Sequence, residues 1–263
     1  MLLYCVGDTS LLKTTQLAIV GSRNYSTYGR NVTDKIISNL TKTNITITSG
    51  LAFGIDTLAH HQALKSNLKT VAIIGTGIDI IYPSNNRELY TKIAHNGLIV
   101  SEFQLGVGPL RHNFPLRNRI ISGLSEGVLV IEAAAKSGSL ITATLALEEN
   151  KEVFAVPGSI FNPTSDGCNN LIAEGAKLVT SAQDIISELR ITEHSPQNII
   201  NSSSEILNLS ETEKLVFDSI GNQLTTTDNI INSTKLSYME VTQMLFELEM
   251  QNLIQSIPRG YIK

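Results

Sequence analysis

The amino-acid sequence predicts an α/β protein with a doubly wound parallel sheet and a small C-terminal winged-helix domain. Two observations predict the sheet. Short runs of β-branched and other apolar residues alternate with longer amphipathic segments through the first two hundred residues, and glycine or serine follows nearly every run. A third observation predicts the second domain: after a polar segment, the remaining residues show three short helical patterns and a pair of strand patterns.

Six buried strands are expected in the larger domain. Each run is apolar on both faces, as are the strands of a parallel sheet that helices cover on both sides. The runs occupy residues 17–20, 45–48, 71–74, 98–100, 128–131 and 153–156. The helical segments between them occupy residues 28–41, 56–66, 86–95, 116–124 and 139–150. Because a helix connects each strand to the next, the strands are expected to run parallel.

The loops that follow the strands are rich in glycine and serine. In a parallel sheet these loops lie at the carboxyl edge, where open α/β sheets bind their ligands. Backbone N–H groups, hydroxyls and the positive ends of the following helices favour an anion there. The clearest loops contain Gly21, Ser22 and Arg23, then Ser49 and Gly50, and finally Ser137, Gly138, Ser139 and Leu140. In the last loop, either Ser137 or Ser139 is expected to cap the next helix.

A basic stretch runs from Arg111 to Arg119. It has three arginines in nine residues and no acidic residue from position 103 to 125, whereas the whole chain has a formal charge of −4. A local excess of cations of this kind marks a place for an anion. Phe114 adds a flat apolar face, and this mixture suits a single nucleic-acid strand, whose phosphates meet cations and whose bases stack on aromatic rings. We expect Arg111 and Phe114 to precede the helix that follows.

Arg117 and Arg119 lie two apart on the predicted helix and so face different ways. At most one of them is expected to face a ligand, and the other serves an ion pair within the fold. Glu102 and Glu132, each at or near a strand end, could form a carboxylate pair for hydrolysis. We prefer the interpretation that they hold these arginines in place.

Two further motifs allow a catalytic interpretation. The loop at Gly21 lacks the G-x-G-x-x-G spacing of a nicotinamide enzyme, and the frame around Ser139 is not that of a nucleophilic serine. Asp56 and His60 are four apart on one predicted helix and could act as an acid–base or metal pair. More often such a pair caps a helix start and satisfies a buried imidazole.

The C-terminal part is expected to be a separate domain. Residues 191–204 are polar, with a proline and a serine run, and predict a linker between domains of residues 1–190 and 205–263. The helical patterns lie at residues 211–220, 226–232 and 238–251, and the strand pair lies within residues 253–262. This domain holds eight acidic and four basic residues, and its third helix has no basic residue. We therefore expect it to contact protein, or nothing, and not to grip DNA.

Composition excludes several classes of protein. No apolar run approaches the roughly 18 residues of a membrane span, and the start of the chain lacks the features of a signal peptide. Cys5 and Cys168 are the only cysteines, which favours a reducing cytoplasm over a disulfide framework. No His/Cys cluster has metal spacing, and we expect neither a metal nor a cofactor.

Taken together and in order, these motifs resemble those of the DprA/Smf family of DNA-processing proteins. The resemblance extends from about Leu17 to Leu189, and the ordered set is specific although no single piece is decisive. It rests on Val20-Gly21-Ser22-Arg23, Ser49-Gly50-Leu51-Ala52, Gly77-Ile78-Asp79, Tyr82-Pro83, Ser101-Glu102, Phe114-Pro115, Arg117-Asn118-Arg119, Ser137-Gly138-Ser139-Leu140 and Val156-Pro157-Gly158.

The resemblance implies an extended Rossmann-like domain that binds single-stranded DNA without chemistry and forms a homodimer. It also implies that the protein protects incoming DNA and helps to load the RecA recombinase in natural transformation and recombination. The residues that resemble the DNA pocket of the family are Gly21, Ser22, Arg23, Ser49, Gly50, Arg111, Phe114, Ser137, Gly138, Ser139 and Leu140, to which we add Arg117 and Arg119. Many members carry a helical domain before the first strand, and we expect it to be absent here or the start to be late.

Two other functions stay open. A related Rossmann-like group hydrolyses the N-glycosidic bond of nucleoside monophosphates and uses a P-G-G-x-G-T-x-x-E motif at the same sheet edge. In this chain the corresponding residues 132–142 lack the glycine pair, and no Glu follows until Glu148. The other hypothesis is a scaffold whose larger domain has lost ligand binding and which acts through its acidic second domain. Affinity for single-stranded DNA would indicate the binding protein, release of free base from AMP would indicate the hydrolase, and the scaffold would show neither.

Overall fold

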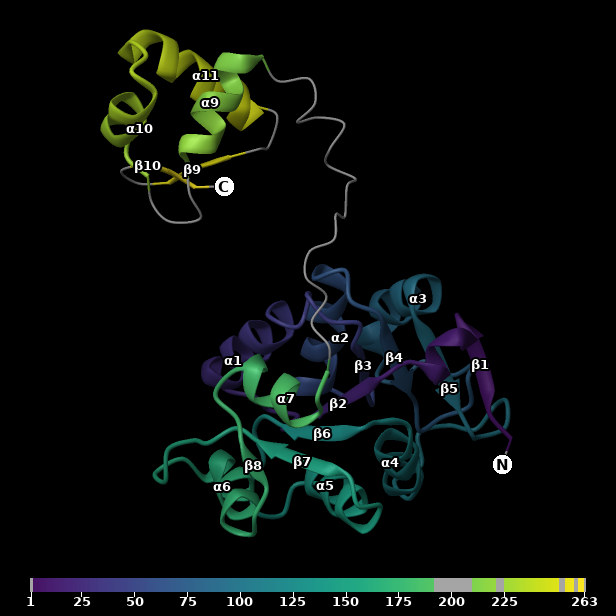
Figure 1. Cartoon of the computed structure of the whole chain (residues 1–263). Coiled ribbons are helices and arrows are strands. Elements are labelled where there is room, and N and C mark those ends of the chain that lie inside the picture. The colour runs from purple at the N-terminus through teal and green to yellow at the C-terminus, as the bar shows by residue number, and fades with distance from the viewer. Residues whose placement is uncertain (1, 192–209, 221–224, 251–253, 258–259, 263) are drawn as a thin grey trace. The chain divides into compact units, whose positions relative to one another are not determined.

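The computed structural model describes residues 2–191, 210–220, 225–250, 254–257 and 260–262 (Figure 1). The chain divides into two compact units, Met1–Ser195 and Pro196–Lys263. Apart from Ile191, the linker predicted at residues 191–204 lies outside the described residues. The linker and the domain limits that were drawn from it therefore stay predictions.

The first unit contains an eight-stranded sheet in the order β1-β5-β4-β3-β2-β6-β7-β8. Every neighbouring pair is parallel except β1 with β5. The strands are β1 (Tyr4–Gly7), β2 (Gln16–Val20), β3 (Thr46–Ser49), β4 (Thr70–Ile73), β5 (Leu98–Ser101), β6 (Gly127–Val130), β7 (Glu152–Ala155) and β8 (Lys177–Leu178). The six strands expected from the sequence are confirmed, each within a residue of its predicted ends.

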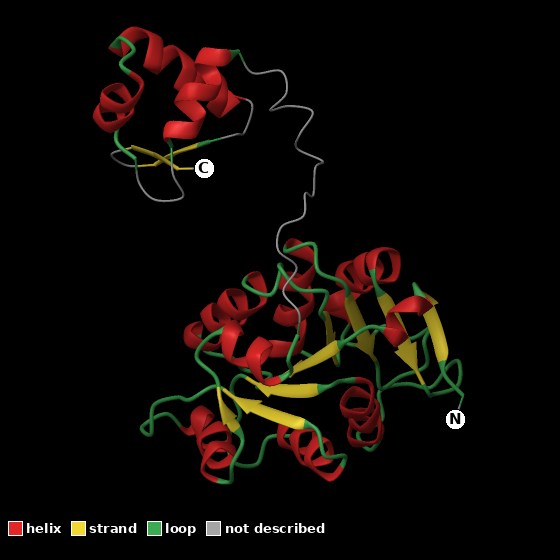
Figure 2. Cartoon of the chain, viewed as in Figure 1, coloured by secondary structure: helices red, strands yellow, loops and turns green. Residues whose placement is uncertain are grey.

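Helices cover both faces of this sheet (Figure 2). Within residues 2–191 they are α1 (Thr27–Ser38), α2 (Ile55–Lys65), α3 (Arg87–Asn96), α4 (Asn113–Leu124), α5 (Ser139–Glu148), α6 (Asp166–Ala173) and α7 (Ala182–Glu188). Buried side chains of α1, α2 and α7 belong to one core cluster, and those of α4, α5 and α6 belong to another. The sheet is therefore doubly wound, as the sequence predicts.

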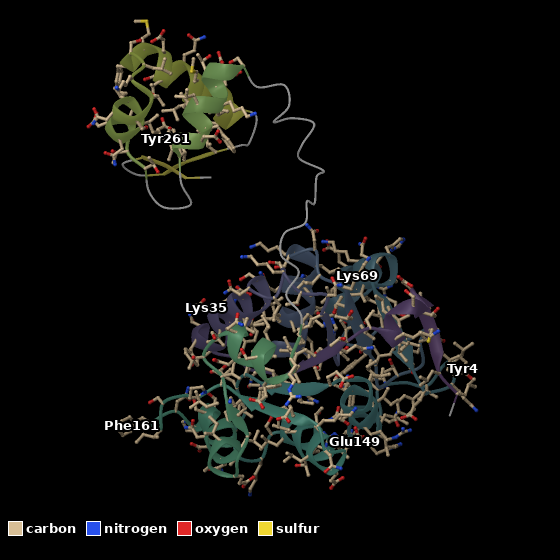
Figure 3. The ribbon with its side chains drawn as sticks, in the orientation of Figure 1. Tyr4, Lys35, Lys69, Glu149, Phe161 and Tyr261 are labelled. Atoms are coloured by element: carbon tan, nitrogen blue, oxygen red, sulfur yellow. The ribbon has the colours of Figure 1, made fainter. Side chains whose placement is uncertain are left out.

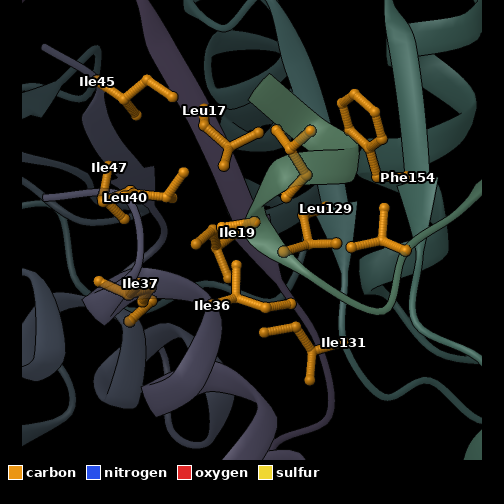
Figure 4. Packing of buried hydrophobic residues seen from close by; sticks show 14 of the residues in the cluster. Leu17, Ile19, Ile36, Ile37, Leu40, Ile45, Ile47, Leu129, Ile131 and Phe154 are labelled. Atoms are coloured by element: carbon orange, nitrogen blue, oxygen red, sulfur yellow. The ribbon is translucent and has the colours of Figure 1, made fainter. Parts of the chain in front are cut away.

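The two core clusters divide the strands by alternate residues. Leu17 and Ile19 of β2 pack in the cluster on the α1 side, whereas Ala18 packs in the cluster on the α4 side. In the first cluster, Leu129 of β6 and Phe154 of β7 lie with them, all fully buried (Figure 4). Successive side chains of a strand point to opposite faces, so a run that is apolar throughout fixes the strand between two layers of helices.

The strand order reverses between β2 and β6. From β2 the chain adds β3, β4 and β5 on one side, and it then crosses to add β6 and β7 on the other side. The chain therefore leaves these neighbouring strands for opposite faces of the sheet, toward α1 after β2 and toward α5 after β6. In open α/β sheets this switch point at the carboxyl edge is where ligands bind.

The structure contains elements that the sequence interpretation missed. The outermost strands β1 and β8 and the helices α6 and α7 were not predicted, although α7 begins with a capping box between Ser181 and Asp184. The start of α4 was also wrong: this helix begins at Asn113, three residues early, so that Phe114 lies in its first turn. Pro115 fits there because the first N–H groups of a helix have no partner within the helix.

The second unit has the three helices and the strand pair that the sequence predicts. They are α9 (Glu211–Ser219), α10 (Thr227–Thr234), α11 (Tyr238–Met250) and the antiparallel strands β9 (Gln255–Ile257) and β10 (Gly260–Ile262). A capping box between Ser210 and Glu213 begins α9, and the Thr226 hydroxyl caps α10. The core of this unit includes Val216, Ile230 and Leu245, one from each helix.

Candidate nucleic-acid interface

The loop after β2 places Arg23 at the carboxyl edge of the sheet. Its backbone is held from two sides: the Ser22 N–H donates to the Glu132 carbonyl at 2.6 Å, and the Ser22 carbonyl accepts the Ile55 N–H at 3.1 Å. The loop passes so close to α2 that a Cβ at Gly54, whose φ is +95°, would lie 2.1 Å from the Ser22 carbonyl oxygen. Glycine is therefore required at position 54, and the exposed Arg23 side chain begins from a fixed backbone.

Two aromatic rings lie beside the Arg23 guanidinium. Its Cζ is 5.9 Å from the centroid of the Phe114 ring, and that ring lies 5.8 Å from the Tyr82 ring at a tilt of 46°. Phe114 packs against the backbone of Gly75, where an added Cβ would approach the ring to 3.0 Å. The loops after β2 and β4 and the first turn of α4 thus bring one cation and two partly exposed rings together. This grouping offers a charge for a phosphate and flat faces for bases.

A groove opens on another side of Arg23. Its volume is about 450 Å³, and it is lined by Arg23, Asn24, Tyr25, Phe53, Gly54, Thr57 and Leu58. Phe53 is exposed there, on the loop between β3 and α2. Arg23 therefore contributes both to this groove and to the pair of rings formed by Phe114 and Tyr82.

The loop after β6 lies beside the same helix, α4. Asn118, one turn after Phe114, donates from Nδ2 to the Gly138 carbonyl at 3.4 Å. Gly138 is exposed, and an added Cβ there would meet nothing within 4 Å. The hydroxyls of Ser137 and Ser139 bond to each other at 2.6 Å. The loop thus presents hydroxyls and an uncrowded backbone next to α4.

The predicted capping of α5 by serine is wrong. The N-cap residue is Gly138, without a side-chain cap, and the Ser137 hydroxyl instead accepts the Ser139 N–H at 3.3 Å. Leu140 is partly buried and packs against the core cluster to which buried residues of α4 and α5 belong. Of this loop, only the residues before Leu140 are therefore placed to meet a ligand.

Arg117 is buried beneath the site, with 4% of its surface exposed. Its Nη1 donates to the carbonyl of Ile73, at the end of β4. The guanidinium lies so close to Gly50 that an added Cβ there would be 2.0 Å from Nη1. Arg117 is thus a structural residue: it ties α4 to the ends of β3 and β4 and does not reach a ligand at the surface.

The charge of Arg117 interacts with the buried carboxyl group of Asp56. Its Oδ2 accepts the Gly50 N–H at 3.1 Å. Burial raises the pKa of Asp56 to about 6, against the opposing effects of the Arg117 charge and of the backbone N–H groups of residues 50 and 52. Asp56 therefore anchors the loop after β3, and it is the structural interpretation of this residue that the geometry favours.

His60 is likewise internal to the fold. Its Nδ1 lies 2.7 Å from the Thr70 hydroxyl, which itself donates to the Ile47 carbonyl at 2.7 Å. Because the hydroxyl hydrogen is used in that bond, the imidazole Nδ1 is the donor. Burial lowers the pKa of His60 to about 3, so the ring is neutral at pH 7. Asp56 and His60 do not form an acid–base pair that faces solvent.

The remaining predicted site residues divide by exposure. Ser49 is buried, with its hydroxyl donating to the Ile19 carbonyl at 2.6 Å, and Gly50 is buried with its N–H bound to Asp56. Arg119 pairs with Glu102, as the sequence interpretation preferred. Arg111 is exposed ahead of α4. Neither Ser49 nor Gly50 is exposed for direct contact with a ligand, and both shape the loop after β3.

Glu132 has a different partner from the one expected. Its carboxylate accepts the Ser26 N–H at 2.8 Å and the Ser26 hydroxyl at 2.6 Å, so it holds the start of α1 and not an arginine. The spacing of the sequence could not reveal this, because the two residues are 106 positions apart. Glu132 is buried and is not available as a hydrolytic carboxylate.

Two residues of the site were not predicted from the sequence. The Tyr82 ring lies beside the Phe114 ring at a tilt of 46°, and Phe53 lines the groove beside Arg23. Both follow a strand that ends at the carboxyl edge, as do the glycine and serine residues that the sequence predicts to lie in the site. Their aromatic character, within loops that follow the strands, was the signal that could have predicted them as site residues.

The described part of the chain contains neither of two features that would indicate other classes of site. No group of three or more His, Cys, Asp or Glu side chains there could hold a metal ion. No helix in it has both the length and the apolar character that crossing a membrane requires.

Comparison with known proteins gives matches over both units. Residues 1–190 match the profile of the family described as DNA recombination-mediator protein A, and residues 202–260 match the DprA winged helix domain. The chain is 50% identical to DNA processing protein DprA of Streptococcus pneumoniae over 188 residues, which are 72% of this chain and 66% of that protein. It is 42% identical to protein Smf of Escherichia coli over 267 residues, which cover 99% of this chain and 71% of that protein.

Solved structures agree with the fold. The X-ray structure of DprA from Streptococcus pneumoniae superposes with a TM-score of 0.69 and covers 71% of this chain and 65% of its own. DNA processing protein A from Helicobacter pylori, whose structure was described for its single-stranded DNA binding mode, gives a TM-score of 0.66 at 37% identity over 72% of this chain and 86% of that one. This chain therefore spans about two thirds of the Streptococcus pneumoniae protein.

The two neighbouring arginines of α4 should differ sharply in their effect on stability. Arg117→Met leaves the Asp56 carboxylate without its nearest cation and is expected to lower the free energy of unfolding by roughly 3 kcal/mol or more. Arg119→Met removes a partly exposed pair with Glu102 and is expected to cost about 1 kcal/mol or less. Urea unfolding of the full chain at pH 7.5 measures both, and equal effects would contradict the structural role of Arg117.

His60 should make the fold sensitive to acid. Its pKa is about 3 in the folded chain against 6.5 ordinarily, so the unfolded chain takes up the proton first as the pH falls. The stability that neutral His60 contributes is complete above pH 6.5 and is lost as the pH falls toward 3, by up to about 1.4 kcal/mol per pH unit.

Asp56 acts in the opposite direction, because its raised pKa of about 6 adds stability that is lost as the pH rises from 3.8 through 6. The effect of His60 is therefore isolated by comparing the natural chain with His60→Gln in urea at pH 7.5, 5.5 and 4.5. The stability advantage of the natural chain should shrink at each step. A constant difference would contradict the neutral, buried state of this imidazole.

Proposed function

This chain belongs to the DNA recombination-mediator protein A family, and from that premise we propose that its Rossmann-like unit binds single-stranded DNA. The observation that carries the proposal is the grouping of Arg23 with the rings of Phe114 and Tyr82 at the switch point of the sheet. The unpaired bases of a single strand can stack on such rings while the guanidinium meets a phosphate, whereas the bases of a duplex are already stacked on each other.

The strand is expected to follow the carboxyl edge. The exposed and partly exposed residues of the site lie in the loops after β2, β3, β4, β5 and β6 and in the first turn of α4. Arg23, Arg111, Phe114 and the loop from Ser137 to Ser139 are the contacts that we propose, together with Tyr82 and Phe53. Gly21 and Ser22 shape the first loop, and Ser49, Gly50 and Arg117 support it from below.

We propose that the protein acts without catalysis. The acids and the imidazole that a reaction would need form hydrogen bonds inside the fold. Asp56 bonds to Gly50, His60 to Thr70, and Glu132 to Ser26. None of the three is exposed. The site instead presents a cation and aromatic rings, which suit binding and not catalysis.

In the cell we propose a role as a mediator of recombination. A protein that covers a single strand protects it and can deliver it to a recombinase, and the family description names such a mediator. We infer that this chain protects incoming strands and helps to load the RecA recombinase during natural transformation. The two free thiols, Cys5 and Cys168, support a place in the reducing cytoplasm.

We also propose a homodimer that forms at the β8 edge of the sheet. Leu178 of β8 is 44% exposed, and the loop between β7 and α6 carries Phe161 at 90% exposure, projecting from the unit (Figure 3). β8 pairs with β7 alone among the described strands. An open strand edge beside exposed apolar side chains favours pairing with a second chain.

Loss of the Arg23 cation should weaken binding of a single strand. In fluorescence anisotropy with oligo-dT at low salt, Arg23→Ala is expected to cost about 1–2 kcal/mol, or roughly 5- to 30-fold in Kd. Affinity should fall steeply with salt, and a duplex of equal length should bind more weakly. Lys35→Ala, which removes an exposed cation from the far end of α1, is the matched control and should change little. If the natural chain has no affinity for oligo-dT at low salt, the proposed function is wrong.

The dimer should depend on one edge of the sheet only. By light scattering the natural chain is expected at twice its mass of 28.6 kDa, and Leu178→Glu is expected to yield monomers. Val6→Glu introduces the same charge on the exposed face of β1, at the opposite edge, and should remain dimeric. A monomeric natural chain, or a dimer that only Val6→Glu disrupts, would contradict the proposed surface.

A further inference from the structure

The third helix of the second unit, α11, has two apolar faces. Val241, Leu245 and Leu248 are fully buried in the core of the unit. On the other side, Met239 is 81% exposed and Phe246 is 63% exposed. These two are seven residues apart, two turns along the helix, so they lie above one another and point away from the core.

Carboxylates flank this outer apolar stripe. Glu240 and Glu247 are also seven apart and follow Met239 and Phe246 by one position, so they form a parallel row on one side. Glu249 lies on the other side of the stripe. The row is ordered: Glu240 accepts the Ser237 N–H at 2.9 Å, and Glu247 accepts from the Gln243 amide at 3.0 Å. The residues of α11 include no Lys, Arg or His.

The charge of this face excludes two occupants. In a winged helix the third helix enters the major groove, and it needs cations to lie beside phosphates. Here Glu240 and Glu247 would instead repel them. A second copy of the same face would bring these rows of carboxylates together and is disfavoured for the same reason.

We propose that the outer face of α11 is a docking site for a protein that offers an apolar groove with a basic rim. Met239 and Phe246 are the anchors that enter the groove, and the glutamates pair with Lys or Arg at its edges. Such helix-in-groove contacts use anchors spaced at i and i+7. Charge complementarity then selects the partner and speeds its association, while the buried anchors give most of the affinity. The site is separate from the proposed strand-binding edge of the first unit.

The test places a photoreactive benzoylphenylalanine at position 246 of the full chain and irradiates living cells of the host. Asn229, an exposed residue of α10 in the same unit, receives the same group as the control. The proposal expects a protein adduct at 246 that is absent at 229. A nucleic-acid adduct, an adduct with a second copy of the chain, or the same products at both positions would overturn it.

The protein found in the adduct is then purified and its affinity for the full chain is measured. Phe246→Ser and Met239→Ser should each weaken binding at least tenfold, with unchanged melting temperature because both side chains are exposed. Glu240→Gln with Glu247→Gln should weaken it further at low salt and flatten its dependence on salt. Thr242→Ser, also exposed on α11, should have no effect. Unchanged affinity in the two apolar variants, or in the glutamine pair, would refute the docking site.

Binding of oligo-dT gives an independent readout. Phe246→Ser should bind oligo-dT as the natural chain does, because the stripe lies in the other unit. Failure of the docking proposal therefore leaves the proposed function intact, and failure of strand binding leaves the docking proposal to be judged by the partner alone.

Discussion

The buried guanidinium of Arg117 is the constraint on which the carboxyl edge of the sheet depends. It lies on α4, donates to the end of β4 and fills the space over Gly50, and its charge opposes the rise that burial causes in the pKa of Asp56. A charge inside a fold is tolerated only with polar partners, and Arg117 has the Ile73 carbonyl as a hydrogen-bond acceptor and the Asp56 carboxyl as a nearby opposite charge. The bond to Ile73 ties α4, which carries Phe114, to the end of β4.

The basic stretch from Arg111 to Arg119 therefore serves the site in different ways. Arg111 is exposed ahead of the helix, Arg117 is internal, and Arg119 is paired with Glu102. Counting arginines overstates the charge that a ligand meets. The stretch places Phe114 beside Arg23. The surface cation next to this ring, Arg23, comes from a loop more than eighty positions earlier in the chain.

Much of this was predictable from the sequence, because apolar runs bounded by glycine and serine leave few arrangements of parallel strands. The loops of the site and the pairing of Arg119 follow from that pattern. The partner of Glu132 and the burial of Ser49 do not, because long-range polar contacts depend on how far each loop turns back over its neighbours. The start of α4 lies three residues before the predicted one, because the first turn of a helix accepts Pro115.

A single strand is proposed to lie across the aromatic and cationic cluster at the switch point of the sheet. Cross-linking tests it most directly: oligo-dT carrying 5-iododeoxyuridine is irradiated with the full chain, and the modified peptides are identified by mass spectrometry. Adducts on Phe114, Tyr82 or Phe53 are the predicted result. Adducts confined to the second unit, at Tyr238 or Phe246, would contradict the claim.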